Sequence, residues 1–162
     1  MSSPLHASLR RAHQEATLAN LLLAATVELR RDRRQWLPIP RPDLREDQLG
    51  VRWTLEVAKR GMNLTQISGW AFPEDDQLTR SSAPCLLAVG ENTAWIMPGL
   101  MVERPDVLSV FPASGLAASN RLKSGFAFEL STGLLPENIL VWRVMIGIVN
   151  RPPLVTPDFQ LT

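Results

Sequence analysis

Residues 139–149 read ILVWRVMIGIV, the longest and most apolar strand-like stretch of the chain. Valine and isoleucine dominate it, and Arg143 is its one charged residue. Strands that are buried on both faces have continuous apolar runs, whereas half-buried strands alternate. The stretch therefore predicts a β-strand inside a sheet, and we expect it to be central.

Shorter strand patterns precede this stretch, separated by Pro, Gly, Asn and Asp. Apolar side chains at positions 51, 53, 55 and 57 alternate with other residues, which is typical of a strand with one buried face. Further strands are expected over 62–72, 85–89, 93–97 and 126–130, with residues 90–92 (GEN) as a hairpin turn. The spacing predicts a mainly β domain over residues 51–150, an antiparallel β-sandwich of about six to eight strands, with a small barrel as the alternative.

The N-terminal segment has a helical pattern. Ser3 is a good N-cap, Pro4 suits the first helical position, and no further proline occurs before Pro38. We therefore expect residues 1–35 to form one long N-terminal α-helix that precedes the sandwich. Its apolar residues between 16 and 29 need burial on more than one side, either on the β domain or on copies of the helix. The stripe expected to bind a partner or a second copy comprises Leu18, Leu22, Ala25 and Leu29.

Two proline-rich segments flank the expected sandwich. Residues 36–50 contain three prolines, at 38, 40 and 42, and are interpreted as a linker because proline blocks a helix and favours an extended path. Residues 151–162 contain three more and are interpreted as an extended tail.

Charge and cysteine content narrow the class of protein. The 162 residues carry a net charge of +1, with +4 over residues 1–45 and −3 over the remainder. The basic residues are diluted by acids and prolines, so we do not expect nucleic-acid binding.

The apolar run at 16–27 is shorter than a membrane span and is followed at once by charges, so we expect neither a membrane anchor nor export. The single cysteine, Cys85, lies in an apolar run, and these features together predict a cytoplasmic protein.

Three ordered motifs within the β region carry a resemblance to a known family. They are Ile67–Phe72 (ISGWAF), Arg104–Val107 (RPDV) followed by Phe111-Pro112, and Ser124–Phe128 (SGFAF). Together they resemble the small β-sandwich accessory domain found beside bacterial glycosyltransferases and other surface-glycan enzymes. The resemblance covers about residues 50–150. One departure is the first hairpin, where residues 90–92 stand in place of that family's Asp-Gly turn.

Four residues are candidates for ligand binding, namely Trp70, Trp95, Arg104 and Asp106. The two tryptophans could stack on a sugar ring, and the charged pair could bind sugar hydroxyls. The tryptophans could instead be core aromatics, and Arg104 and Asp106 could be part of a charged turn. For all four residues this structural interpretation is favoured over ligand binding. No catalytic residue, metal site or cofactor is expected, because the only histidines, His6 and His13, lie in the N-terminal segment with no ligand spacing.

The resemblance and the lack of a catalytic constellation imply a non-catalytic accessory module associated with glycan biosynthesis. It would bind a carbohydrate weakly or dock a glycosyltransferase. The alternative is a structural or assembly subunit of a bacterial or phage complex, a homo-oligomer joined through the N-terminal helix. A small hydrolase or transferase is a third and less favoured hypothesis.

Overall fold

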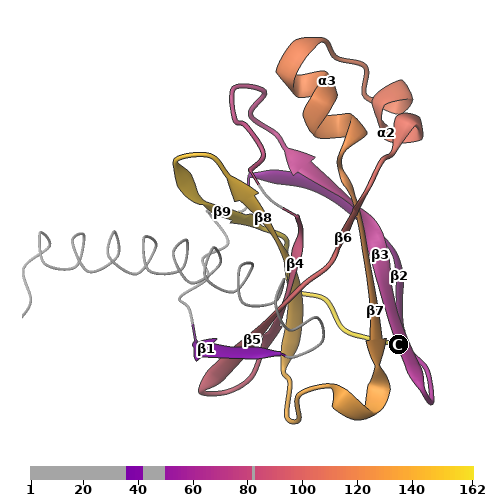
Figure 1. Cartoon of the computed structure of the whole chain (residues 1–162), viewed down its shortest axis with the longest axis vertical. Helices are drawn as coiled ribbons and strands as arrows, with labels where there is room; N and C mark the ends of the chain where they lie inside the picture. Colours follow the sequence, from indigo (N-terminus) through magenta and orange to yellow (C-terminus); the bar gives the residue numbers. More distant parts are fainter. Residues whose placement is uncertain (1–35, 42–49, 82) are drawn as a thin grey trace, which may run out of the picture.

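The computed structural model describes residues 36–41, 50–81 and 83–162 (Figure 1). This part folds into two antiparallel sheets, a five-stranded one with the order β1-β5-β4-β8-β9 and a four-stranded one with the order β2-β3-β7-β6. The strands are β1 (Leu37–Pro40), β2 (Val51–Arg60), β3 (Leu64–Pro73), β4 (Cys85–Val89), β5 (Thr93–Pro98), β6 (Leu100–Val102), β7 (Gly125–Ser131), β8 (Val141–Ile148) and β9 (Arg151–Val155).

Val141–Ile148 of the stretch quoted first form β8, and all residues of β8 after Val141 are buried. It lies between β4 and β9, so the prediction of a strand inside a sheet is confirmed. The middle position, however, belongs to β4, whose five residues CLLAV are all buried. The expected hairpin is also present, because β4 pairs with β5 and the Gly90 N–H donates to the Thr93 carbonyl at 2.8 Å.

The expected fold class, a sandwich of six to eight strands preceded by one long helix, is contradicted and needs correction, although the described residues are mainly β and form two antiparallel sheets. The described residues form nine strands rather than six to eight, and their α-helices are two short ones, α2 (Pro105–Val110) and α3 (Gly115–Leu122). Two of the strands lie in segments that were expected to be a linker and a tail. Residues 37–40 pair with β5 at a sheet edge, where proline's missing N–H is tolerated, and residues 151–155 pair with β8 as β9. The expected long helix over residues 1–35, including Leu18, Leu22, Ala25 and Leu29, lies outside the described residues.

The two sheets share one apolar core. Its buried side chains come from both sheets and include Ile67, Phe126, Phe128, Leu86, Ile96 and Val144. Figure 1 shows the four-stranded sheet beside the strands of the five-stranded sheet, with α2 and α3 together at one end. The helices lie on the segment between β6 and β7, where Pro105 occupies the start of α2.

The C-terminal residues connect the two sheets. Phe159 and Trp142 of β8 exchange both backbone hydrogen bonds, at 2.9 and 3.0 Å. Three residues later, the Thr162 N–H donates to the Ala58 carbonyl of β2, and the Arg60 N–H donates to the Thr162 carbonyl. The chain end therefore bridges β8 of one sheet and the β2 edge of the other.

Candidate functional site

The three sequence motifs, far apart along the chain, meet at the helical end of the four-stranded sheet. Trp70 of β3 is the register partner of Gly125, the first residue of β7, and Gly69 is the partner of Phe126. The Ala71 N–H donates to the Ser124 carbonyl at 2.9 Å. We call this junction of β3, β7 and the start of α2 the motif corner.

Two glycines make the close packing of the motif corner possible. A Cβ atom at Gly69 would lie 2.1 Å from the carbonyl oxygen of Thr54 in β2. A Cβ atom at Gly125 would lie 2.5 Å from the Val102 carbonyl oxygen and 2.8 Å from Cγ of Arg104. Both positions therefore require glycine because neighbouring backbone, and at Gly125 the stem of Arg104, fills the space of a side chain.

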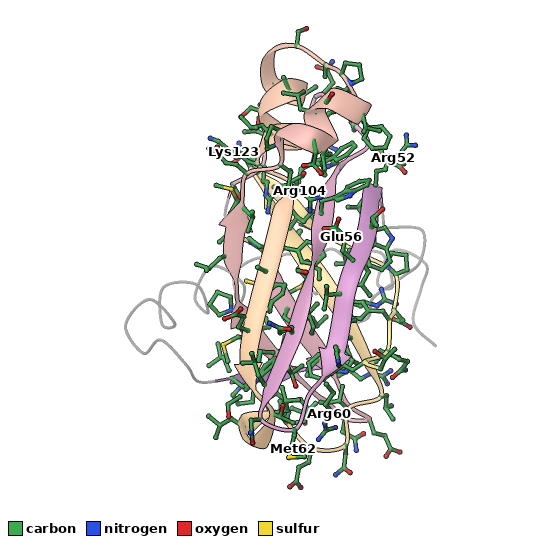
Figure 2. All side chains as sticks on the ribbon, turned by 90° about the vertical axis from the view of Figure 1, so that its right-hand side faces the viewer. Arg52, Glu56, Arg60, Met62, Arg104 and Lys123 are labelled. Carbon is green, nitrogen blue, oxygen red and sulfur yellow. The ribbon has the colours of Figure 1, made fainter. Side chains whose placement is uncertain are left out.

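Arg104 is held by two carboxylates. Its Nε donates to Oδ1 of Asp106 at 2.9 Å and its Nη2 donates to Oδ2 at 2.8 Å, which is a bidentate pair. Nη1 and Nη2 also donate to the two carboxylate oxygens of Glu56 in β2. Cγ of Arg104 lies over Gly125 of β7, and Glu56 lies on the edge strand β2, so the ion pair spans the outer face of the sheet from β7 to β2 (Figure 2).

These ion pairs shift the protonation equilibria of their members. Hydrogen bonds from Arg104 lower the pKa of Asp106 from 3.8 to about 2, and the two carboxylates raise the pKa of Arg104 above its ordinary value. All three nitrogens of the guanidinium are engaged. The geometry thus favours the structural interpretation of Arg104 and Asp106, as a tie between α2 and β2, over direct contact with a ligand.

The low pKa of Asp106 makes part of the stability of the fold depend on pH. Because the folded-state pKa of about 2 lies below the model-compound value of 3.8, the ion pair stabilises the fold above pH 3.8 and is lost as the pH falls towards 2. We expect Asp106→Asn to have a lower urea midpoint than the parent protein at pH 6 and a smaller decrease between pH 4 and pH 2. Glu103→Gln is the control, because it removes an exposed carboxylate that has no ion pair among the described residues. If the urea midpoints of Asp106→Asn and the parent protein decreased equally between pH 4 and pH 2, this account would be contradicted.

Trp70 belongs to an aromatic cluster beside the motif corner. Its ring stacks on Phe72 with centroids 5.6 Å apart and planes inclined by 15°, and Phe111 packs against both rings at 5.5 and 5.6 Å. Phe111 follows α2 and so brings the helical segment onto the outer face of β3. Trp70 is half-buried, and its face is occupied by these neighbours.

Trp95 lies in the other sheet, away from the other three candidates, and lines a groove of about 720 Å³. Trp36, before β1, lines the same groove and packs edge-on against Trp142 at 5.9 Å. The remaining lining comes from the β4–β5 turn and from the loop before β8, and includes Glu91, Asn92, Glu137 and Asn138. We call this the tryptophan groove.

The structure therefore brings Trp70, Arg104 and Asp106 together at one corner and places Trp95 in a separate groove. Sequence reasoning missed Trp36 and the two asparagines, because their segments are remote in sequence and meet only through the sheet register. It also missed Phe72, although its position two residues after Trp70 puts both rings on one face of the strand.

The described part of the chain offers no metal-binding cluster, since no three His, Cys, Asp or Glu side chains in it lie close enough together. None of the helices in these same ranges is long and apolar enough to cross a membrane. Comparisons of the chain with models of protein families, with curated proteins and with solved structures find no match.

Proposed function

We propose that this chain is a non-catalytic accessory module of cytoplasmic glycan metabolism that binds a neutral carbohydrate weakly in the tryptophan groove. The motif resemblance supports the association with glycan enzymes, and a glycosyltransferase is the proposed protein partner. The observation that carries the proposal is the lining of the groove by two half-buried tryptophans with polar side chains around them.

The chemistry of the groove suits a sugar ring. Tryptophan rings offer flat apolar surfaces to the C–H groups of a pyranose, and amides and carboxylates hydrogen-bond to its hydroxyls. The side-chain amides of Asn92 and Asn138 have no hydrogen-bond partner among the described residues, so their donors and acceptors remain available. Asn138 has a φ of +59°, a left-handed conformation that asparagine adopts more readily than most residues.

The test uses the indole N–H signals of the five tryptophans in a ¹H–¹⁵N NMR titration with neutral oligosaccharides of glucose, mannose and N-acetylglucosamine. We expect the signals of Trp36 and Trp95 to shift while those of Trp53 and Trp70 stay fixed. Trp95→Ala should weaken binding about tenfold or more, because truncation of a tryptophan in a contact surface is among the costliest substitutions.

Two further variants separate recognition from folding. Asn92→Ala removes an exposed amide from the groove and should weaken binding without changing the urea midpoint. Met62→Ala, at the 92% exposed tip of the β2–β3 hairpin, should bind like the parent protein. The absence of any shift of Trp36 and Trp95 with all three sugars would contradict carbohydrate binding in this groove.

A subunit of a larger assembly is the alternative function, and one observation favours it. Within the described residues β6 is the edge of its sheet, and its three side chains, Leu100, Met101 and Val102, are exposed. An apolar edge strand is a template for pairing with a second chain. Light scattering on the titration samples distinguishes the two proposals. A defined oligomer that does not bind the sugars would support the assembly, and a monomer that binds them would exclude it.

A further inference from the structure

A second groove lies beside the aromatic cluster, on the outer face of the four-stranded sheet. It has a volume of about 470 Å³ and is lined by Arg52, Phe72, Glu74, Val110, Phe111, Pro112 and Arg121. Strands β2 and β3 and the residue after β3 supply one wall, and the end of α2, the turn after it and Arg121 of α3 supply the other. We call it the arginine groove.

The two arginines of this groove differ in how far their hydrogen-bonding capacity is used. Arg121 donates from Nη1 to the carbonyls of Phe111 and Pro112, at 2.8 and 3.0 Å, and from Nη2 to Asp76 at 3.0 Å. It thereby fixes the turn that carries Phe111, and its charge is balanced by a carboxylate. Its buried Nε has no hydrogen-bond partner among the residues that the structure describes.

Arg52, in contrast, has no hydrogen bond or ion pair in the described part of the chain, and its side chain is exposed. Its guanidinium lies over the ring of Phe111, with Cζ 4.3 Å from the ring centroid. This cation–π contact holds the planar group in place and leaves its N–H edges available. Glu74 lines the same groove but does not lie within ion-pair distance of Arg52.

We propose that the arginine groove binds a small organic anion, an oxyanion carried on a sugar-sized body, with Arg52 as the group that binds the oxyanion. A guanidinium fork matches a carboxylate or a phosphate with two parallel hydrogen bonds. The groove is far larger than a bare ion needs and lies within the size range of small-molecule sites. Its apolar lining of Phe72, Val110, Phe111 and Pro112 suits the C–H face of a ring.

This inference concerns a different groove from the neutral-sugar proposal and does not rest on it. The two are measured through different signals, Arg52 Nε–H for the arginine groove and the indole of Trp95 for the tryptophan groove. A failure of one therefore leaves the other standing.

The experiment titrates the full chain with glucuronate, glucose 6-phosphate, glucose and inorganic phosphate, and follows the Arg52 Nε–H signal and the aromatic signals of Phe111. We expect the two acidic sugars to shift both residues and to bind at least tenfold more tightly than glucose or inorganic phosphate. Comparison of glucuronate with glucose 6-phosphate shows which oxyanion the groove prefers.

Arg52→Gln should weaken binding of the preferred acidic sugar about tenfold or more, because the substitution removes the charge-assisted hydrogen bonds to the oxyanion. Arg60→Gln is the matched control, since Arg60 is an exposed arginine at the opposite end of the same strand (Figure 2). Both substitutions are at exposed positions, and equal urea midpoints would verify that both variants fold. The proposal would be overturned if Arg52→Gln and Arg60→Gln bound the acidic sugar with equal affinity. It would also be overturned if glucose or inorganic phosphate bound to the parent protein as tightly as the acidic sugars, or if no acidic sugar bound.

Discussion

Replacement of Gly69 by alanine is expected to destabilise the fold by about 3 kcal/mol, the upper end of the usual cost of overpacking. The added methyl would lie 2.1 Å from the Thr54 carbonyl oxygen and 3.0 Å from Cζ of Phe126. The oxygen belongs to the backbone of β2 next to a bulge between Leu55 and Val57, so it cannot move without disturbing the pairing of β2 with β3. The measurement is the free energy of unfolding from urea titration, followed by far-UV circular dichroism.

Gly133→Ala is the matched control for this substitution. A Cβ atom at Gly133 would meet no atom of the described residues within 4 Å, and the residue does not have a positive φ. The free energy of unfolding should therefore change by less than about 0.5 kcal/mol, as for other exposed positions. Equal effects of the two substitutions would show that the close approach of β2 to β3 at Gly69 is not required for stability.

Asp158→Asn is expected to destabilise the protein by about 3 kcal/mol, whereas removal of its partner Arg143 costs less than about 1 kcal/mol. Arg143 of β8 is only 7% exposed, and its Nε donates to the carboxylate of Asp158. Without that carboxylate a buried charge remains uncompensated, and Nη1 of Arg143 already lacks a hydrogen-bond partner within the described part of the chain. In Arg143→Met the buried charge itself is gone, and the half-exposed Asp158 can be hydrated.

The comparison is made by urea unfolding at pH 7 on Asp158→Asn, Arg143→Met and the double variant. The double variant should be about as stable as Arg143→Met, because the cost of Asp158→Asn arises only while Arg143 is present. An Arg143→Met variant that is less stable than Asp158→Asn would mean that the ion pair contributes net stability, contrary to this account.

The strands could be predicted from the sequence because their information is local. Alternation over Val51–Leu55 and the continuous apolar run of β8 each reflect how many faces of the strand are buried, whereas Val57, beyond the bulge that follows Leu55, is exposed. The number of strands and the helices could not be predicted in the same way. Residues 37–40 look like a linker because of two prolines, and only the edge position beside β5 allows them to pair. The Ala- and Ser-rich residues 115–122 have a weak helical pattern and form α3 in the segment that returns from β6 to β7.

The site was less accessible to sequence reasoning than the fold. Trp95 was recognised as an aromatic on a strand, but its groove is completed by Trp36 and Asn138, which lie 59 positions before it and 43 after it. Arg104 and Asp106 were recognised as a charged turn, while their third partner Glu56 is 48 positions from Arg104. Such side chains are brought together by strand order, which no periodicity encodes.

The motif corner has a consequence for what a shared signature can mean. Gly69 and Gly125 are glycines because backbone occupies the space of their side chains, and the guanidinium of Arg104 is engaged by Asp106 and Glu56. The three motifs therefore specify a packed joint between a helix and a sheet. The residues proposed to bind ligands, Trp95 of β5 and Arg52 of β2, lie outside these motifs, so the signature by itself describes a scaffold and does not identify a ligand.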